Sequence, residues 1–320
     1  MSLPELKIGK LTAKIPIIQG GMAVRISTGA LAGAVAATGA VGIIGASGMT
    51  FDELRSEIRI ARELAGGGIV GINIMYAARE FWGIVQTAIQ EKIDLIITGA
   101  GFSRDVFKFG NDNHTPVVSI VSSARLAQTA EKLGAAAIIV EGKEAGGHLG
   151  TDRSIWDIFP EVLAAVKLPV IAAGGIMFGG DVVKALKLGA SGVQMATRFV
   201  LAEECAASPE YKAVYQRATK DDVVIIQSPV GMPGRAIKTA FVEKILKDEA
   251  PKPVGCDFCL KKCSLKYCII QALVNSQKGD VDHGVVFSGE YVWKIKDRTI
   301  KPAKKIIEEI VSEAEEAMKQ

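Results

Sequence analysis

Eight short runs of apolar, mostly β-branched residues recur along the first 200 residues of this chain, and they constrain its fold more than any other feature. Runs that are apolar throughout, rather than at alternate positions, are typical of strands buried on both faces. Segments with helical periodicity separate them. The runs are IPIIQ (15–19), VGIIGA (41–46), IVGINIM (69–75), DLIITG (94–99), PVVSIV (116–121), AAIIVEG (136–142), LPVIAAGG (168–175) and SGVQMAT (191–197).

Eight alternating strand and helix units predict an α/β fold, a (β/α)8 TIM barrel, over residues 1–204. A doubly wound sheet is the alternative, but it more often has fewer strands and a single Gly-rich fingerprint. The alternation stops after about residue 205. We expect residues 205–320, with a Cys-rich segment and a terminal amphipathic helix, to pack on the barrel as a cover over its mouth.

Composition narrows the partners of the chain. Hydrophobic residues make up 49% of its 320 residues, enough for a large core, and 38 basic against 35 acidic residues give a net charge of +3. This balance predicts a small-molecule substrate rather than nucleic acid or an anionic membrane. The first residues lack a signal-peptide pattern, which predicts a cytoplasmic protein; a homodimer is left open.

One uncharged stretch, residues 28–46, is about long enough to cross a bilayer. It consists mostly of Ala and Gly, and Thr38-Gly39 interrupts it. We therefore expect a helix, a turn and a strand in a soluble domain, with no membrane segment.

The carboxyl ends of barrel strands open onto one face, which carries the active site. Glycines dominate the residues that follow the predicted strands, and they let a flat or phosphorylated ligand lie close to the backbone. Two of these segments, AAGGIMFGGD and MATRF, follow strands seven and eight, where barrels often bind phosphate. Flavin mononucleotide (FMN) would satisfy both requirements.

His148 lies in the segment EGKEAGGHLG, which follows the sixth run. Its unperturbed pKa, about 6.5, suits either proton transfer or the orientation of a substrate oxygen. The alternative is a histidine at a strand-to-loop corner that only makes a backbone hydrogen bond.

The segments IIQGGMA, GINIM, TGAG, EGKEAGGHLG, LPVIAAGGI and GVQMATRF resemble, in this order, the FMN-dependent nitronate monooxygenase family, formerly called 2-nitropropane dioxygenase. This family includes FMN-dependent enoyl-acyl-carrier-protein reductases. The resemblance covers roughly residues 12–240. It implies catalysis by His148 and cofactor binding by Gly20, Gly21, Met22, Asn73, Gly146, Gly147, Gly174, Gly175, Gln194, Ala196 and Thr197.

Within this set, the resemblance places residues 20–22 against the flavin ring and assigns Gly174, Gly175, Ala196 and Thr197 to the phosphate. Ala196 departs from the family, which commonly has glycine there. Its methyl group narrows the pocket but leaves the N–H donor.

The activity expected from the resemblance is oxidation of alkyl nitronates. The first alternative is reduction of an enoyl thioester with NAD(P)H, and the second is a non-catalytic barrel that binds flavin or a phosphorylated metabolite. Arg25 follows the first strand, where it either faces an anionic substrate or is a solvated residue that opens the first helix.

Four of the five cysteines fall within 13 residues, in the pattern C-x2-C-x3-C-x4-C. The resemblance assigns no role to Cys256, Cys259, Cys263 and Cys268. Three interpretations stay open: a metal or iron–sulfur site, reduced thiols of which the first three lie on one face of a helix, or disulfides. No metal ligand is assigned.

Overall fold

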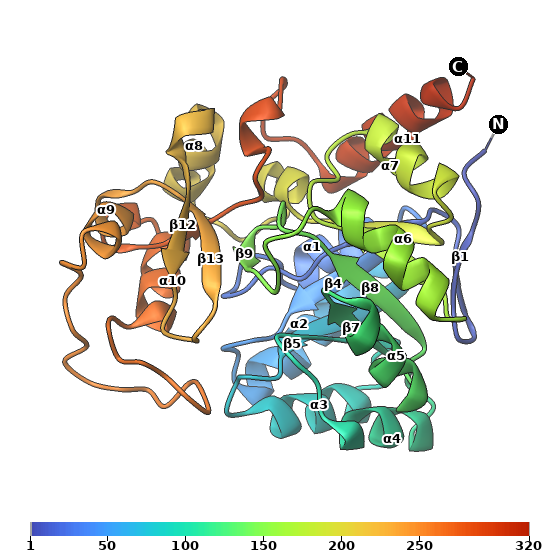
Figure 1. The fold of residues 1–320 in the computed structure, drawn as a ribbon, viewed down its shortest axis with the longest axis horizontal. Helices are drawn as coiled ribbons and strands as arrows, with labels where there is room; N and C mark the ends of the chain where they lie inside the picture. Colours follow the sequence, from blue (N-terminus) through green and yellow to red (C-terminus); the bar gives the residue numbers. More distant parts are fainter. Residues whose placement is uncertain (1, 320) are drawn as a thin grey trace.

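The computed structural model describes residues 2–319 and contains a closed barrel of eight parallel strands. The predicted (β/α)8 fold and all eight predicted strands are confirmed (Figure 1). In chain order the strands are β3 (Ile17–Gln19), β4 (Val41–Gly45), β5 (Ile69–Met75), β6 (Leu95–Gly99), β7 (Val117–Val121), β8 (Ala137–Glu141), β10 (Val170–Ala173) and β11 (Gly192–Met195).

Seven helices follow the first seven strands, and their apolar faces pack on the outside of the barrel. They are α1 (Gly29–Ala36), α2 (Phe51–Ala65), α3 (Phe81–Gln90), α4 (Arg104–Asp112), α5 (Ala124–Lys132), α6 (Ile155–Ala165) and α7 (Gly179–Lys187). The stretch at 28–46 forms α1, a turn and β4, as predicted. None of the helices described in residues 2–319 has the length and hydropathy of a membrane span.

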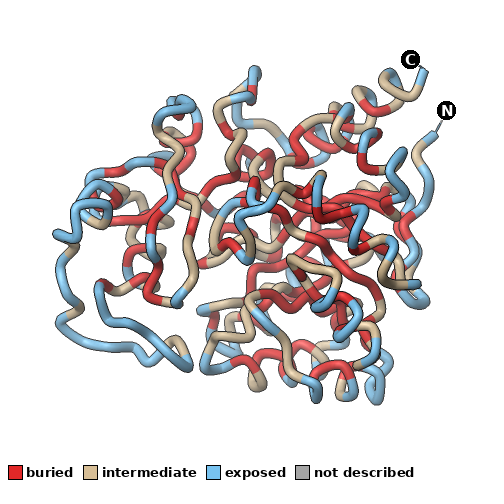
Figure 2. Tube along the Cα trace, viewed as in Figure 1, coloured by how far each residue is buried: buried red, intermediate tan, exposed pale blue. Residues whose placement is uncertain are grey.

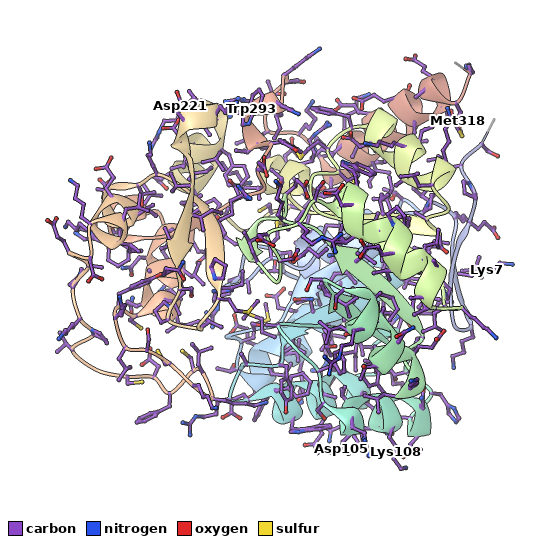
Figure 3. The ribbon with its side chains drawn as sticks, in the orientation of Figure 1. Lys7, Asp105, Lys108, Asp221, Trp293 and Met318 are labelled. Carbon is purple, nitrogen blue, oxygen red and sulfur yellow. The ribbon has the colours of Figure 1, made fainter. Side chains whose placement is uncertain are left out.

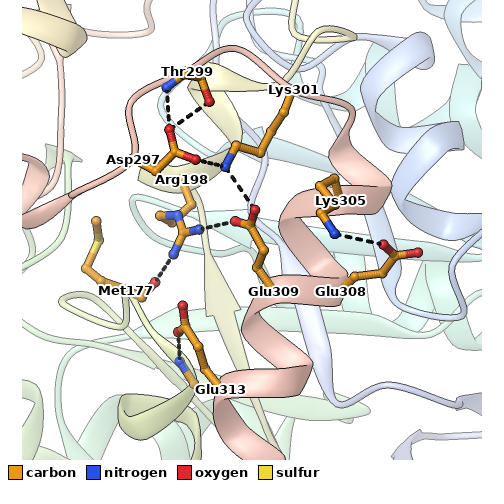
Figure 4. A network of polar contacts seen from close by, with 10 residues as sticks. Met177, Arg198, Asp297, Thr299, Lys301, Lys305, Glu308, Glu309 and Glu313 are labelled. Atoms are coloured by element: carbon orange, nitrogen blue, oxygen red, sulfur yellow. Dashed lines mark hydrogen bonds and ion pairs between the residues drawn. The ribbon is translucent and has the colours of Figure 1, made fainter.

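The terminal helix α11 (Ala303–Ala317) lies on the barrel wall, between α7 and α1, where a (β/α)8 barrel has its eighth helix. Its predicted apolar stripe is largely buried, with Ile306, Ile307, Ile310 and Ala314 in the core. Polar contacts join it to the 3-10 helix η1 (Thr197–Leu201) that follows β11. Figure 4 shows Glu309, which binds Arg198 at 3.1 Å and Lys301 at 2.9 Å.

The N-terminal end of the barrel is closed by a hairpin of β1 (Leu6–Ile8) and β2 (Leu11–Ala13), which we did not predict. Leu6 and Ile8 join a cluster of barrel-interior side chains that includes Ile43 and Ile139. Figure 2 shows the buried residues concentrated in the strands. Charged side chains of both signs, among them Lys7, Asp105, Lys108 and Asp221, project outward at the surface (Figure 3).

A second, smaller unit lies at the carboxyl ends of the strands, opposite the hairpin (Figure 1). Its sheet contains β12 (Val223–Gln227), β13 (Pro233–Ile237) and β14 (Val286–Phe287), and β9 (Gly147–His148) of the barrel loop also pairs with β13. Three helices, α8 (Pro209–Arg217), α9 (Ala240–Leu246) and α10 (Ile269–Gln277), and three short 3-10 turns, η2 (Lys220–Asp222), η3 (Val281–His283) and η4 (Val292–Lys294), complete it. The predicted boundary between barrel and cover at residue 204 stays a proposal. Helix α11, which the sequence analysis included in the cover, contributes no residue to the cavity described next.

Candidate active site

A cavity of about 660 Å³ lies between the carboxyl ends of the barrel strands and the C-terminal unit. All of the predicted site residues line it. They are Gly20, Gly21, Met22, Asn73, Gly146, Gly147, His148, Gly174, Gly175, Gln194, Ala196 and Thr197. The fold thus brings together residues from the ends of five barrel strands. Their individual roles stay predictions.

The floor of the cavity is tightly packed at the end of β3. A Cβ atom on Gly21 would lie 2.5 Å from Cβ of Asn73, so only glycine fits beneath that side chain. Gln19 fixes the neighbouring turn, because its amide donates to the Gly20 carbonyl and accepts from the Ile43 N–H. These contacts leave a flat, backbone-lined surface under the cavity.

Hydrogen-bonding groups without a protein partner converge at the ends of β10 and β11. The backbone N–H groups of Gly174, Gly175 and Ala196 donate to no acceptor in the described chain, and the buried Gln194 Oε1 accepts no hydrogen bond. Thr197 Oγ1 accepts from Gly289 N–H at 3.2 Å, which leaves its hydroxyl hydrogen available. Buried polar groups normally have partners, so this end of the cavity is built for a polar ligand.

His148 is held by the backbone and by its ring. Its strand β9 pairs with β13, where Gly234 lies opposite His148, and Leu149 N–H donates to Pro233 at 2.8 Å. The ring packs edge-on against Phe287, with centroids 5.2 Å apart, and Nε2 lies 2.8 Å from Ser228 Oγ. Burial lowers the pKa of His148 from 6.5 to about 4. The imidazole is therefore neutral at physiological pH.

Ser228 Oγ also accepts a hydrogen bond from Val230 N–H at 3.4 Å. A hydroxyl group both donates and accepts, so Ser228 can pair with Nε2 in either neutral tautomer of His148. In both tautomers His148 is a neutral hydrogen-bonding group rather than a cation.

Arg235 of β13 clamps the loop that carries His148. Its guanidinium donates to the carbonyls of Lys143 at 2.6 Å and Ala145 at 3.1 Å, and it pairs with Glu290 at 3.3 Å. From the barrel side, Ser122 Oγ donates to the Gly150 carbonyl at 3.0 Å. The two sides of the cavity are thus connected through this loop. The sequence analysis did not predict that Arg235 would reach this loop.

Glu141 was also missed by the sequence analysis. It ends β8, lines the cavity, and has no hydrogen-bonding or ionic partner among the described residues. Burial raises its pKa from 4.5 to about 7. A carboxyl group that exchanges a proton near neutral pH therefore faces the cavity.

Arg25 lines the cavity but is not free to neutralise an anion. Its Nε and Nη2 atoms lie 2.5 and 2.7 Å from the two carboxylate oxygens of Glu53. Such a bidentate pair compensates the arginine charge locally. The structure places Arg25 at the cavity, and this pairing accounts for its charge.

Part of the cavity wall, including the side formed by α10, is apolar, and we call it the apolar arm. Methionines of the barrel loops and aliphatic side chains of the C-terminal unit form its walls. They are Met22, Val24, Met49, Met75, Ile84, Val230, Leu260, Ile269, Ile270, Leu273 and Val274.

The cysteines do not lie as the helical interpretation expected. That interpretation is wrong, because Cys256, Cys259 and Cys263 lie outside any helix, and α10 begins only after Cys268. The five cysteines are free of disulfides. Within residues 2–319, no three His, Cys, Asp or Glu side chains are placed to hold a single metal ion.

Comparison with known proteins decides the family. A sequence profile of the nitronate monooxygenase family matches residues 4–81 and 67–313, which is most of the chain. The chain belongs to this family. It is an oxidoreductase by this membership, as the resemblance of its motifs implied.

Characterised relatives differ in the activities that their names give. A probable nitronate monooxygenase of Staphylococcus saprophyticus is 30% identical over 299 residues, covering 78% of this chain and 84% of the relative. The (3aS,4S,5R,7aS)-5-hydroxy-7a-methyl-1-oxo-octahydro-1H-indene-4-carboxyl-CoA dehydrogenase of Mycobacterium tuberculosis is 32% identical over 233 residues, covering 72% and 65%.

Solved structures share the whole fold. FabK from Thermotoga maritima superposes with a TM-score of 0.85 at 34% identity, covering 95% of this chain and 94% of that one. Nitroalkane oxidase from Streptomyces ansochromogenes gives a TM-score of 0.80 at 22% identity, covering 95% and 97%, and shows the fold alone.

Proposed function

We propose that this family member binds FMN and reduces a 2-enoyl thioester with electrons from NAD(P)H. The observation that carries the substrate class is the apolar arm, which suits an acyl chain and exceeds what a short nitronate requires. The carboxyl-CoA named for the Mycobacterium tuberculosis relative is also a thioester.

The cavity fits FMN in its donor groups and its shape. The floor at Gly20 and Gly21 would accept the flat ring, and a side chain at Gly21 would collide with Asn73. The unpartnered N–H groups of Gly174, Gly175 and Ala196, with the Thr197 hydroxyl, would hold the phosphate. Bound flavin supplies the redox chemistry, and the protein supplies position and polarity.

His148 would act on the substrate carbonyl. In the tautomer with its proton on Nδ1, the neutral imidazole would donate a hydrogen bond to the thioester oxygen and polarise the double bond without placing a charge in the cavity. Ser228 and Arg235 fix the ring and its loop. Residues of the C-terminal unit form part of the cavity wall opposite the strand ends.

Nitronate oxidation is the second candidate, and the low pKa of His148 favours it over oxidation of neutral nitroalkanes. A nitronate has already lost its proton and needs no base, whereas a base of pKa about 4 removes a carbon-bound proton poorly. Cytoplasmic location and a homodimer stay predictions.

The two activities are separated by supplying purified, flavin-loaded protein with each substrate pair. We expect enoyl-dependent oxidation of NADH or NADPH, with kcat/KM rising as the acyl chain lengthens. Val274→Phe should narrow the arm and lower activity with long chains, while a four-carbon enoyl thioester, the internal control, is spared. Oxygen consumption with propyl-2-nitronate, and no reaction with any enoyl thioester, would establish the second candidate instead.

A further inference from the structure

The segment between α9 and α10, residues 250–268, crosses from the C-terminal unit to the barrel. It contains no helix, and in Figure 1 it runs as an extended orange trace below the C-terminal unit. Towards its end it is held by the C-terminal unit, where Ser264 N–H donates to the Pro229 carbonyl at 3.0 Å. Its middle part, residues 257–261, contacts the barrel, and we call this part the strap.

The strap is attached to the barrel through the backbone just before α3. Arg79 N–H donates to the Cys259 carbonyl at 3.0 Å, and Lys261 N–H donates to the Ala77 carbonyl at 2.9 Å. Two chains that exchange hydrogen bonds in this way run antiparallel. The attachment therefore has the geometry of a very short β-ladder between the barrel and the C-terminal unit.

Ala78 and Leu260 lie opposite each other between these two hydrogen bonds and form an isolated antiparallel bridge. Because the flanking residues make the hydrogen bonds, this is a non-hydrogen-bonded pair, in which the two Cα atoms lie about 4.5 Å apart. Both residues line the cavity. The bridge thus joins two walls of the cavity that belong to different parts of the chain.

Side chains add to this attachment but bury little of it. Lys261 Nζ donates to the Tyr76 carbonyl at 2.7 Å and lies 3.7 Å from the centre of the Tyr76 ring. Arg79 lies over the Phe258 ring, which is 63% exposed. Both cationic residues are exposed as well. Releasing the strap therefore breaks a few solvent-exposed contacts and disrupts no core, which is typical of segments that open locally.

The strap lies where the cavity reaches the surface. Few of the residues that line the cavity are exposed, and all but Gly146 come from the strap or from segments close to it. We call these residues the rim. They are Gly48, Thr50, Glu80, Asp257 and Gln271.

Contacts join the segments of the rim to one another. Gly48 packs on α10, because a Cβ atom there would lie 3.1 Å from Ile270 Cδ1. Gly83 of α3 packs on the Phe51 ring of α2, and the strap pairs with the residues just before α3. The rim is therefore a connected border, in which the strap links the barrel edge to the C-terminal unit.

We propose that the strap is a gate at this rim, which releases from residues 77–79 to let a long acyl chain reach the apolar arm and then pairs again. Since Ala78 and Leu260 meet across the rim, a chain passes when this pair separates. The acyl ligand rests on the function proposed above. The gate concerns access to the arm alone, so it is tested without catalysis.

A disulfide that holds the strap closed tests the gate in the full-length protein. Ala78→Cys and Leu260→Cys place two thiols at a Cα separation that a disulfide spans. The native cysteines of the segment are replaced so that they do not compete, by Cys256→Ser, Cys259→Ser, Cys263→Ser and Cys268→Ser. Mass spectrometry checks the disulfide after mild oxidation, and failure of the two thiols to pair would refute the bridge and the gate with it.

Access is measured at a reporter thiol in the arm, Val274→Cys, which reacts by addition to the double bond of octylmaleimide. Peptide mass spectrometry follows labelling at residue 274. The matched control carries Ala78→Ser and Leu260→Ser, which remove the same side chains and form no cross-link. We expect the cross-linked protein to be labelled at least about tenfold more slowly than this control. Equal rates would overturn the proposal.

Loosening the strap should have the opposite effect. Lys261→Ala removes the hydrogen bond to the Tyr76 carbonyl and should speed labelling at residue 274 by about three- to tenfold. Lys262→Ala is the control, because the Lys262 side chain has no hydrogen-bonding or ionic partner among the described residues. Equal labelling rates in these two variants would contradict the tethering of the strap and, with it, the gate.

Discussion

Gly179 and Gly180 are adjacent glycines at the start of α7, yet a methyl group should affect them in opposite ways. A Cβ atom on Gly179 would lie 2.1 Å from the Ala314 backbone nitrogen and 2.5 Å from the Glu313 Cβ of α11. The N–H of Gly179 also donates to Glu313 Oε2 at 2.8 Å. A Cβ on Gly180 would meet nothing within 4 Å.

We expect Gly179→Ala to force α7 and α11 apart, since the obstructing atoms are backbone and cannot rotate away. The cost should be about 3 kcal/mol of unfolding free energy, the upper part of the range for overpacking. With an unfolding entropy of roughly 0.7 kcal/mol per kelvin for a chain of this size, Tm falls by about 4 to 5 °C. Gly180→Ala should instead gain about 0.5 kcal/mol, or about 1 °C, from helix propensity.

Differential scanning calorimetry of the two variants and the parent protein measures these shifts directly. The paired design removes effects of composition and of the unfolded chain, which both substitutions share. Equal melting temperatures for the two variants would show that α11 does not pack on α7 as described, and the assignment of α11 as the eighth barrel helix would be refuted.

Three further predictions concern the cavity. His148→Gln should keep flavin and lower turnover by about two to four orders of magnitude. The pH profile of the parent protein should show no histidine inflection between about pH 5.5 and 8. An inflection near pH 6.5 that His148→Gln removes would contradict the low pKa of His148. Because burial raises the folded pKa of Glu141 from 4.5 to about 7, its contribution to stability is complete below 4.5 and is lost as the pH rises through 7. The decrease in unfolding free energy reaches about 3 kcal/mol. Glu141→Gln should abolish this pH-dependent decrease when unfolding of the flavin-free protein is measured at several pH values. The same pH dependence in the parent and the variant would argue against the raised pKa of Glu141. Arg235→Ala should free the His148 loop and lower kcat about 10- to 100-fold at constant flavin content, and full activity would show that the clamp is dispensable.

The barrel could be predicted because its strands are buried on both faces and therefore carry a continuous apolar signal. IVGINIM was predicted as residues 69–75 and forms β5 over Ile69–Met75. The resemblance of the motifs implied the individual cavity residues, and the barrel topology explains why they meet, since it brings every strand end to one face. Neither inference required knowledge of long-range pairing.

The C-terminal unit could not be predicted in the same way. Strand β13 has the sequence PGRAI, with Pro and Gly that weaken a strand signal. It pairs with the neighbouring β12 and with partners at residues 147 and 286, which are far away in the chain. Glu141 was missed because its raised pKa depends on burial in the folded structure, which the sequence does not show directly. The cysteine spacing matched a helix face, but Pro251, Pro253 and Gly255 precede a segment without a helix.

The position of α11 has a consequence for how the protein is made. The barrel's eighth strand and the helix that completes its wall are separated by more than 100 residues, so the whole C-terminal unit is inserted within one βα unit. During synthesis, β11 leaves the ribosome long before α11, and an apolar seam between α7 and α1 stays open to solvent meanwhile. Barrel completion thus waits for the synthesis of α11, and until then the folding chain exposes apolar surface that the finished protein buries.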